Sequence, residues 1–402
     1  MVLKNLPMKV LIAMVCGGLI LSLSMGIRQS LGLFMEPMSH GLGWNIGVFS
    51  FALAIQNLLW GLGQPFAGAV ADKFGSGRTL AAGGLLYAVG LVMMANAGSP
   101  WMVHFSGGMI VGIGVAATGF PIVLGAVGRL VPPEKRPQAL GLVAAGGSFG
   151  QFIFAPISQG LIGGVGWWMA LIVLAVFAAL AVPMAAALTG TAKDGGLAGE
   201  YEQTLTSAVR EAMAHPGYLL LVAGFFVCGY HVAFIAVHLP NYLSLCGISP
   251  MMSATALGLI GFFNMIGTWL AGHLGGRYRM KYLLSTIYFA RAAVIALFLI
   301  LPVTETTTLA FSAGMGLLWL GTVPLTSGII AQVFGARYLA TLFGIVLLSH
   351  QVGAFLGAWY GGWAFDTNGS YDMVWISAIG LGIFAGLVHL PIRDNPLERA
   401  TV

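Results

Sequence analysis

The sequence predicts an all-α membrane protein in which twelve transmembrane helices form two pseudo-symmetric six-helix bundles. Three observations support this prediction. The chain of 402 residues is 58% hydrophobic and only 7% charged, which leaves too few charges to cover a water-facing surface of this size. Apolar runs of about 20 residues, the length that crosses a bilayer, recur along the whole chain. The second half of the sequence also repeats parts of the first.

The apolar runs define the predicted spans in order. The first run is too long for a signal peptide and has no small-residue cleavage site, so we interpret it as a spanning helix. The predicted spans are 8–36, 45–71, 79–97, 101–130, 138–162, 166–189, 216–244, 251–275, 281–302, 306–333, 339–364 and 371–392. The least apolar long connection, 190–215, is predicted to be a cytoplasmic linker between an N-terminal bundle, 1–189, and a C-terminal bundle, 216–402. We expect a short surface helix in this linker from about residue 200.

The basic residues determine the predicted orientation. Of the 17 Lys and Arg residues, 15 lie in connections, or at the span ends that flank them, on one side of the twelve spans, and the other two, Arg28 and Arg291, lie well inside spans. The positive-inside rule therefore predicts that both termini are cytoplasmic, and we expect a multi-pass protein of the bacterial inner membrane. Because this distribution accounts for the isoelectric point of 9.2, the positive charge does not indicate a nucleic-acid partner.

The cysteines and the remaining composition argue against an enzyme. Cys16, Cys228 and Cys246 fall in or beside apolar runs, without a pairing framework or metal-ligand spacing, and we interpret them as small apolar filler. The sequence shows no nucleophile–base arrangement and no sizeable soluble domain. It therefore predicts a protein without catalytic residues, metal or cofactor.

An internal repeat relates the two halves. A shift of 203 residues places Gly26-Ile27-Arg28 over Gly229-Tyr230-His231 and Pro37 over Pro240. The same shift pairs Gly141 with Gly344, Val143 with Val346, Gly150 with Gly353 and Phe152 with Phe355, and a shift of 204 pairs Gly68 with Gly272. Two parallel halves related by an axis along the membrane normal place a binding site near the midplane between them.

A motif between the second and third spans carries a family resemblance. The segment GAVADKFGSGR, residues 68–78, resembles the helix 2–3 loop motif of the major facilitator superfamily. There, Gly68 lets two helices approach, Asp72 caps or pairs across a gate, Gly75 turns the chain and Arg78 supplies the partner charge. We therefore expect these four residues to form a gating motif. The second copy, 272–279, is degenerate and lacks the acid.

Two further segments are similar to bacterial relatives of monocarboxylate and oxalate transporters. RQSLGLF, residues 28–34, resembles their basic residue followed by SxxxF, and PEKRPQALGLVAAGGSFG, residues 133–150, resembles their entry into helix 5. There are two departures. The acidic-Gly-aromatic motif before helix 1 is absent, and the Asp/Arg pair of helix 8 appears here as Asn264 and Thr268. Because this removes the usual substrate arginine, lactate-like specificity does not carry over directly.

The ionisable residues inside the spans are neutral or positive. Apart from Glu36, at the outer edge of the first span, we find no acidic residue within the membrane. The embedded ionisable residues are Arg28, Arg291, His231, His238 and His350. A cavity lined by such groups attracts an anion, and an arginine binds a carboxylate in bidentate geometry.

Arg28 is the first candidate for substrate binding or gating, because helix 1 lines the cavity in this superfamily. The alternative is that it snorkels over ~12 Å to the bilayer edge. His231 is its pseudo-symmetric partner, and two basic groups from opposite halves would hold the two ends of one anion. The alternative for His231 is a hydrogen bond to a backbone carbonyl. Arg291 is predicted either to contact substrate or to be tied to backbone carbonyls.

The histidines are the candidates for proton coupling, since the pKa of histidine lies near 6.5. His350 has a ligand or proton role by resemblance to helix 11 of oxalate-type carriers, and His231 and His238 are further candidates. The polar residues Asn57, Gln151, Asn264 and Gln351 are expected to orient the ligand, or else to form helix–helix hydrogen bonds. Tyr230 and Trp359 are expected to wall the cavity. Gly146, Gly147 and Gly150 are expected to let the halves slide or rock.

Together the residues and the resemblance imply a secondary active transporter of a small organic anion, a monocarboxylate by preference. Its two halves would rock around a basic midplane site by alternating access, with proton symport through histidine. Anion exchange and proton-driven export of neutral drugs or metabolites are the alternatives, and export would leave Arg28 and His231 structural. We expect a monomer whose partners are the anion and the lipid bilayer.

Overall fold

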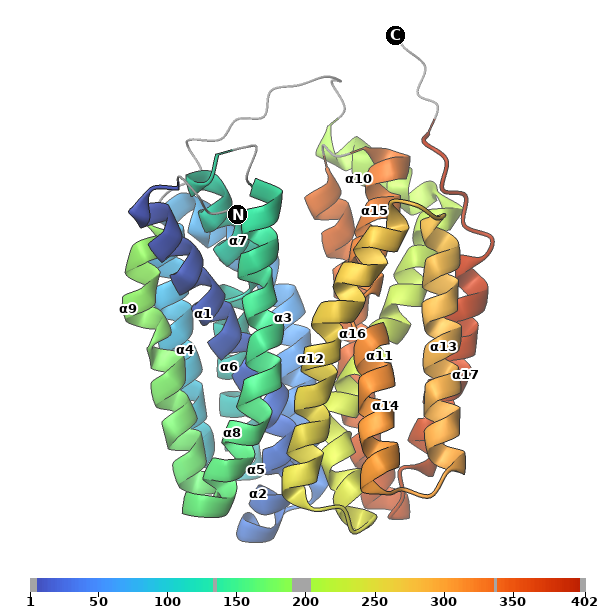
Figure 1. Ribbon diagram of the computed structural model, residues 1–402. Helices are drawn as coiled ribbons and strands as arrows, with labels where there is room; N and C mark the ends of the chain where they lie inside the picture. Colours follow the sequence, from blue (N-terminus) through green and yellow to red (C-terminus); the bar gives the residue numbers. More distant parts are fainter. Residues whose placement is uncertain (1–5, 133–135, 190–203, 336–337, 398–402) are drawn as a thin grey trace.

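The computed structural model describes residues 6–132, 136–189, 204–335 and 338–397, and all of the regular structure in these ranges is helical (Figure 1). In those residues, eleven helical runs are long and apolar enough to cross a membrane. One run, Ala139–Leu188, contains two predicted spans. Inside it Gly166 adopts φ +80°, a conformation open to glycine, and the chain reverses there (Figure 1). The structure thus has the twelve crossings that the sequence predicts.

The N-terminal bundle contains the first six crossings. Its helices are α1 (Met8–Ser30), η1 (Leu31–Phe34), α2 (Met35–Leu42), α3 (Ile46–Phe74), α4 (Ser76–Ala95), α5 (Pro100–Val103), the π-helix η2 (His104–Ile110), α6 (Val111–Ala117), α7 (Phe120–Leu130), α8 (Arg136–Ala179), α9 (Ala181–Ala185) and η4 (Ala186–Leu188). The first crossing therefore extends six residues beyond its predicted end at 36, because η1 and α2 continue α1 to Leu42.

The C-terminal bundle contains the other six crossings. Its helices are α11 (Pro216–Leu245), α12 (Pro250–Gly275), α13 (Met280–Ile300), α14 (Glu305–Leu318), α15 (Thr322–Phe334), α16 (Leu339–Asn368) and α17 (Asp372–His389). A short helix, α10 (Leu205–Ala214), precedes it in the expected linker, and Thr204 caps its first turn. The first part of that linker, 190–203, lies outside the described residues.

Matching breaks occur in the fourth and tenth crossings. The fourth is interrupted between α6 and α7, and the tenth between α14 and α15. Each break is followed by a proline in the first turn of the next helix, Pro121 in α7 and Pro324 in α15. These prolines are 203 residues apart, which is the shift that aligns the two halves of the sequence. The repeat is thus expressed in the backbone.

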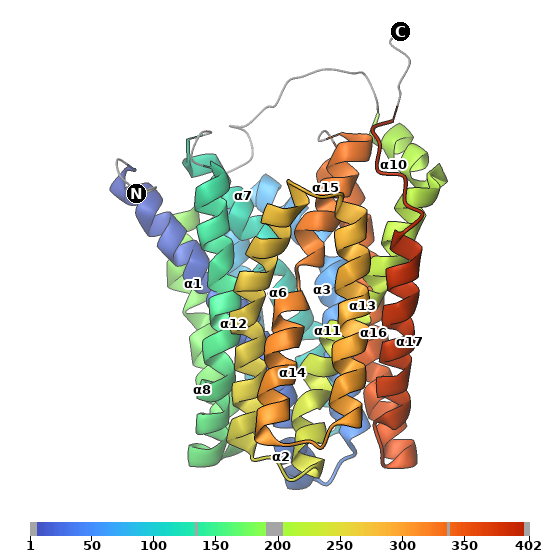
Figure 2. The same cartoon turned by 45° about the vertical axis from the view of Figure 1, so that its right-hand side comes forward.

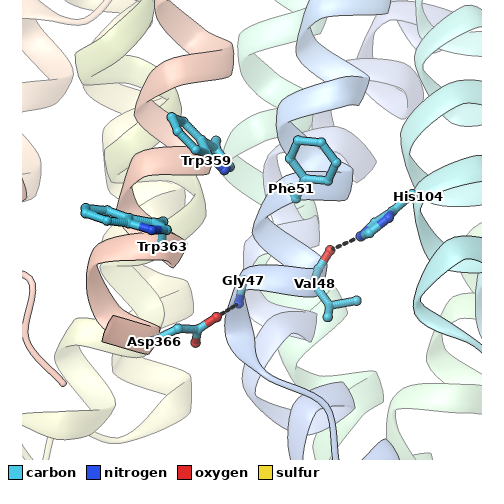
Figure 3. A pocket seen from close by; sticks show the side chains of 7 residues that line it. All are labelled: Gly47, Val48, Phe51, His104, Trp359, Trp363 and Asp366. Carbon is cyan, nitrogen blue, oxygen red and sulfur yellow. Dashed lines mark hydrogen bonds between the residues drawn. The ribbon is translucent and has the colours of Figure 1, made fainter. Parts of the chain in front are cut away.

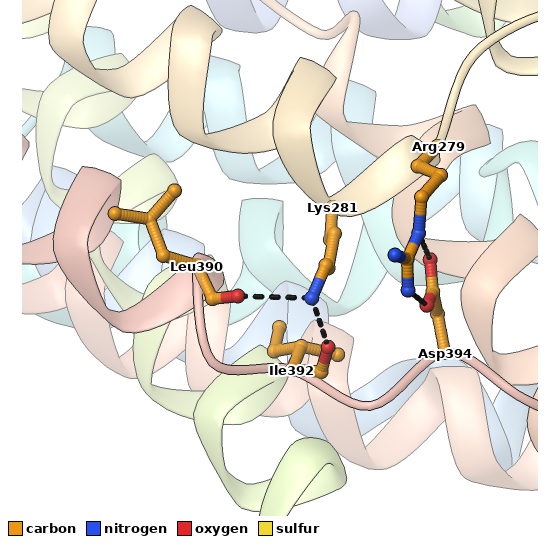
Figure 4. Close-up of polar contacts among 5 residues, drawn as sticks. All are labelled: Arg279, Lys281, Leu390, Ile392 and Asp394. Atoms are coloured by element: carbon orange, nitrogen blue, oxygen red, sulfur yellow. Dashed lines mark hydrogen bonds and ion pairs between the residues drawn. The ribbon is translucent and has the colours of Figure 1, made fainter.

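The two ends of the molecule differ. The start of α1, the end of α17 and α10 lie at one end, here called the terminal end, whereas α2 lies at the opposite or distal end (Figures 1 and 2). At the terminal end Lys281 donates hydrogen bonds to the carbonyl oxygens of Leu390, at 3.0 Å, and Ile392, at 2.8 Å. Beside it Arg279 forms an ion pair with Asp394 (Figure 4). These contacts fix the segment after α17 against the start of α13.

The two bundles touch each other in the distal half. The backbone N–H of Gly47 at the start of α3 donates to Asp366 Oδ2 at 2.8 Å. Ser244 on α11 donates to Glu36 Oε1 at 2.9 Å. Gly32 lies so close to the backbone of α11 that a methyl group there would overlap with the carbonyl of Ala236. These contacts close the distal end.

The two bundles diverge toward the terminal end (Figure 1). Four glycines near it have no atom within 4 Å of where a side chain would begin, and they come from α3, α8, α12 and α16. They are Gly68, Gly141, Gly272 and Gly344. The sequence repeat pairs the same four residues, and the bundles lie further apart at this end (Figure 1). The two bundles are therefore in contact at the distal end and lie further apart at the terminal end (Figure 1).

Two expectations need correction. Gly146 and Gly150 do not lie between the halves; they pack on the backbones of Gly18 and Ser22 in α1, within the N-terminal bundle. Gly147, similarly, faces Met25 and Phe120. The small residues that let α8 approach the other bundle lie instead on α12, where Gly258 and Gly261 contact the backbone of Phe152. Cys246 is exposed just after α11, so it is not buried filler.

Candidate functional site

Arg28 is held by two residues of α3. Its Nη1 donates to Asn57 Oδ1 at 3.0 Å, and the guanidinium carbon lies 4.6 Å from the centre of the Trp60 ring. Asn57 and Trp60 are three residues apart, so they share one face of the helix. Asn57 in turn donates to the carbonyl of Leu53 at 2.8 Å, which fixes its oxygen toward Arg28. The sequence did not single out Trp60, although its spacing from Asn57 is a usable signal.

The charge of Arg28 has no acidic partner in the part of the chain that the structure describes, where no carboxylate oxygen comes within 4.0 Å of it. The buried Nε of Arg28 and Nε1 of Trp60 also lack hydrogen-bond acceptors. An amide and an aromatic face stabilise a guanidinium without neutralising it. Arg28 is partly exposed, so the site retains a net positive charge that an anion can reach.

Three buried glutamines lack partners for some or all of their amide atoms. They are Gln29 on α1, Gln151 on α8 and Gln351 on α16. Gln351 belongs to the other bundle and packs against Gly61, the residue that follows Trp60. Because buried amides are normally hydrogen-bonded, these groups indicate a site that a polar ligand or water completes. Sequence reasoning overlooked Gln29, although it directly follows Arg28 in an apolar helix.

His231 and Tyr230 face the interior of the C-terminal bundle. His231 is fully buried, and its Nε2 is 2.7 Å from the carbonyl oxygen of Ala378 on α17, while its Nδ1 has no partner. The hydroxyl of Tyr230 bonds Ser377 Oγ at 2.7 Å. Arg28 and His231 thus have separate partners in separate bundles. The contact of His231 with the Ala378 carbonyl agrees with the alternative in which His231 bonds a backbone carbonyl.

His238 and Asn264 have well-satisfied hydrogen bonds. The two ring nitrogens of His238 lie 3.2 Å from the Tyr371 hydroxyl and 2.7 Å from the Ala358 carbonyl. Asn264 Oδ1 accepts from the backbone N–H of Leu320, and its Nδ2 donates to Ser148 of α8. Asn264 therefore bridges α8, α12 and the break after α14, which matches the helix–helix alternative.

Arg291 lies fully buried at the same break. Its Nε and Nη2 donate to the carbonyl oxygen of Leu318 at 3.0 and 2.7 Å, and Nη2 also donates to the carbonyl of Trp319. The carbonyls at the end of a helix lack intrahelical partners and carry partial negative charge. Arg291 therefore caps the C-terminus of α14. This geometry agrees with the alternative in which Arg291 bonds backbone carbonyls rather than substrate.

His350 lies between α11 and α16. It is 6% exposed, its ring centre is 5.2 Å from that of Phe225, and its Nδ1 has no hydrogen-bond partner. The side chain of Cys228 is its neighbour on α11. Of the predicted histidines, His350 combines a free ring nitrogen with residual exposure.

Trp359 does not lie beside Arg28 but lines a groove at the distal end. A groove of about 320 Å³ at the distal end lies between α3, η2 and α16 (Figure 3). Its lining residues are Gly47, Val48, Phe51, His104, Trp359, Trp363 and Asp366. Trp359 and Trp363 are 39% and 46% exposed, as interfacial tryptophans usually are. This groove contains the contact between Asp366 and Gly47 that closes the distal end.

The gating motif lies at the terminal end of α3. Gly75 ends the helix with φ +100°, a conformation that favours glycine, and Arg78 is exposed in the first turn of α4. Gly68 faces open space. The side chain of Asp72 lies outside the described part of the chain.

Comparison with known proteins identifies the family. The sequence model of the Major Facilitator Superfamily matches residues 14–323. The chain belongs to the major facilitator superfamily. Members of this superfamily are transporters rather than enzymes, and the twelve crossings and the repeat of two six-helix bundles agree with the assignment.

Several major facilitator transporters are similar over nearly the whole chain. Monocarboxylate transporter 13 of Rattus norvegicus is 25% identical over 391 residues, which cover 92% of this chain and 86% of that protein. The Bos taurus protein of the same name is 26% identical and covers 94% and 89%. The uncharacterized MFS-type transporter YcxA of Bacillus subtilis is 24% identical, with 93% of each chain covered.

Solved structures of the major facilitator fold superimpose closely. A D-xylose-proton symporter matches with a TM-score of 0.74 and 14% identity, over 96% of this chain and 99% of that one. A bacterial homolog of the human lysosomal transporter Spinster, in an inward-facing and occupied conformation, also has a TM-score of 0.74, with 14% identity over 94% and 95%. At these identities the likeness establishes the fold alone.

Proposed function

We propose that this major facilitator transporter carries a small organic anion, a monocarboxylate by preference, by alternating access. The observation that carries the proposal is the partly exposed guanidinium of Arg28, held by Asn57 and Trp60 without a carboxylate in the described residues. A carboxylate ligand supplies the missing acceptors and the missing charge in one bidentate contact. The monocarboxylate transporters among the relatives agree with this substrate class.

The unpartnered amides extend this site. Gln151 and Gln351 lie on the α8 and α16 sides of the molecule and have free amide atoms. Because Gln351 of α16 packs against Gly61, which follows Trp60, we propose that a bound anion contacts both bundles, which is how a cargo couples their movement. We further propose proton symport through His350, because His238 has partners on both ring nitrogens and His231 bonds a backbone carbonyl.

The orientation and assembly are part of the same proposal. The described basic residues of the connections, such as Lys73, Arg279 and Lys281, lie at the terminal end. The positive-inside rule assigns that end to the cytoplasm of a bacterial inner membrane. The structure then corresponds to a cytoplasm-open state of a monomeric carrier.

Uptake into proteoliposomes tests the proposal. Radiolabelled monocarboxylates are presented to wild type, Arg28→Gln, Arg28→Lys and the remote control Arg279→Gln. We expect Arg28→Gln to lower saturable uptake at least about tenfold, equivalent to 1.4 kcal/mol, with Arg28→Lys between it and wild type. Unchanged uptake in Arg28→Gln would refute an anion-binding role for this residue.

The same vesicles separate the coupling modes. Symport predicts that an inward proton gradient drives accumulation, and that His350→Ala loses this dependence. Anion exchange predicts instead that uptake responds to an internal anion and not to the gradient. Transport of neutral compounds that is insensitive to Arg28→Gln would favour the exporter alternative.

A further inference from the structure

A second cluster of chemically active side chains lies inside the C-terminal bundle, around the thiol of Cys228. Cys228 is fully buried, and its Sγ is 3.4 Å from Thr322 Oγ1 and 3.6 Å from Arg291 Nη2. The side chains of His350 and Tyr288 also adjoin the thiol. Three helices, α13, α15 and α16, therefore bring polar groups to one sulfur atom of α11. From the sequence alone we interpret this residue only as small apolar filler.

The internal repeat shows that this position differs between the halves. A shift of 204 residues places Ser24 over Cys228, Thr118 over Thr322 and Tyr87 over Arg291. In the N-terminal bundle Ser24 Oγ bonds Thr118 Oγ1 at 2.8 Å, and the Tyr87 hydroxyl donates to the Ser24 carbonyl at 3.3 Å. The same three positions thus contact one another in both bundles, through hydroxyls and the Ser24 carbonyl in one bundle and through a thiol and a guanidinium in the other.

The buried guanidinium needs a negative partner. Its hydrogen bonds go to the carbonyls of Leu318 and Trp319 and to the sulfur, and the described residues place no carboxylate within 4.0 Å of it. Removing a cation from water is costly unless a counter-charge lies beside it. Carbonyls supply only part of that charge. A thiol beside a guanidinium loses its proton readily, and the thiolate accepts a hydrogen bond from the Thr322 hydroxyl.

We propose that Cys228 is a thiolate that forms an ion pair with Arg291, and that this sulfur is a proton-binding site of the protein. Ionisation breaks the S–H bond and leaves the electron pair on sulfur. The proton passes to the imidazole of His350, and protonation of the thiolate reverses the transfer. The site binds a proton and no larger ligand.

The other ionisable groups around this site are neutral or basic. Arg291 and Tyr288 face it from α13 and His350 from α16, while His231 is on α11 itself and faces α17. From α17, His389 stacks on Tyr288 with ring centres 5.0 Å apart. None of these groups disfavours a negative charge on the sulfur of Cys228. The inference does not depend on which cargo the proposed anion site carries. It shares His350 with the proposed proton symport, but the S–H band of Cys228 tests it without a transport measurement.

Infrared spectroscopy of the S–H stretching band tests the charge directly. The sample is the full chain with Cys16→Ala and Cys246→Ala, so that Cys228 is the only thiol, reconstituted in lipid. We expect no S–H band at neutral pH and its appearance on acidification. The chain that retains only the exposed Cys246 is the matched control, and it shows the band at neutral pH.

Removing the guanidinium supplies the second arm. Arg291→Gln in the single-cysteine background is expected to restore the S–H band of Cys228 at neutral pH, whereas Arg291→Lys keeps it absent. Circular dichroism and size-exclusion profiles report whether each variant folds. If Arg291→Gln does not fold, the pH titration of the single-cysteine chain still decides the question. An S–H band from Cys228 at neutral pH in the presence of Arg291 would overturn the proposal.

Discussion

At the scale of single residues, Arg28 and Arg291 are both cations inside membrane-spanning helices, but different groups stabilise their charges. Arg291 uses the carbonyls at the end of α14 and the sulfur of Cys228, and it is fully enclosed. Arg28 uses one amide oxygen and one ring face, and it remains partly exposed. Enclosure and several bonds to helix-end carbonyls suit a structural role, whereas partial exposure and missing acceptors suit a ligand.

Trp60 is predicted to set the affinity of the Arg28 site. Replacing Trp60 with Leu removes the cation–π contact at 4.6 Å and should raise the KM for anion uptake about 2- to 30-fold, equivalent to ~0.5–2 kcal/mol. Trp60→Phe keeps an aromatic face and should lie nearer wild type. Equal KM values for the Leu and Phe variants would show that the ring face has no part in holding Arg28.

At the scale of elements, the end of α17 depends on one lysine. Lys281 is 8% exposed and donates to the carbonyls of Leu390 and Ile392. Both carbonyls follow the last turn of α17, where backbone carbonyls have no partner within the helix. Lys281→Met should therefore destabilise the bundle by ~1–3 kcal/mol. Arg279→Gln, which breaks an ion pair whose arginine is 53% exposed, should cost only ~0–1 kcal/mol. Thermal unfolding in detergent measures both.

The pH dependence of these two contacts differs. The Arg279 guanidinium holds the pKa of the Asp394 carboxyl below its usual value. The ion pair therefore contributes stability above the ordinary carboxyl pKa of ~3.9 and loses it as the pH falls through the lowered value. The hydrogen bonds of Lys281 go to backbone carbonyls, which do not titrate. Acidification should thus reduce the difference in the free energy of unfolding between wild type and Arg279→Gln. The difference between wild type and Lys281→Met should stay the same.

Two glycines of α8 are predicted to respond oppositely to the same substitution. A methyl group at Gly150 would overlap with the backbone of Ser22 in α1, whereas nothing lies within 4 Å of that position at Gly141. Gly150→Ala should lower the unfolding temperature, since backbone must move, and Gly141→Ala should not lower it. Similar losses for both variants would contradict the α1–α8 packing described here.

At the scale of the whole molecule, the bundles touch at the distal end and along the middle of α8 and α12, and they diverge toward the terminal end (Figure 1). Asp366 at the end of α16 accepts from Gly47 at the start of α3, so a carboxylate of one bundle lies at the positive end of a helix in the other (Figure 3). Such a contact is worth ~0.3–1 kcal/mol. It exists only while the distal end is closed, so it favours that state.

Asp366→Asn should therefore shift the population toward distal opening. The expected shift is about 2- to 5-fold, and Asp372→Asn, at the start of α17, is the matched control. A cysteine at buried Ser50, in a chain otherwise free of cysteine, reports the opening by its labelling rate. Equal labelling rates in the two variants would remove Asp366 from the closing contacts.

The exposed Cys246 reports the orientation of the molecule. It follows α11 at the distal end, so a membrane-impermeant maleimide should label it in intact cells, while buried Cys228 stays unlabelled. Partial burial raises the pKa of the Cys246 thiol. Because the thiolate reacts, labelling should accelerate about tenfold per pH unit below that pKa. Labelling only after permeabilisation would place the distal end in the cytoplasm.

The sequence predicted the architecture because membrane spans obey a local rule. Each span must be a helix of about 20 apolar residues, and the repeat shift of 203 reappears in the positions of Pro121 and Pro324. The candidate residues were less predictable. Periodicity does not tell which face of a buried helix meets a ligand and which meets a neighbour, so Trp359 was expected in the cavity and lies in the distal groove.

The sequence alone determined the class of the protein, the number of crossings, and the scarcity of embedded acids, because composition and apolar length settle these quantities. Only the tertiary structure decided which buried cation remains available to a ligand. Arg28 meets an amide and a ring, whereas Arg291 meets helix-end carbonyls and a thiol, and each partner is distant in the chain. The charge of a buried group depends on such neighbours, and packing rather than local sequence selects them.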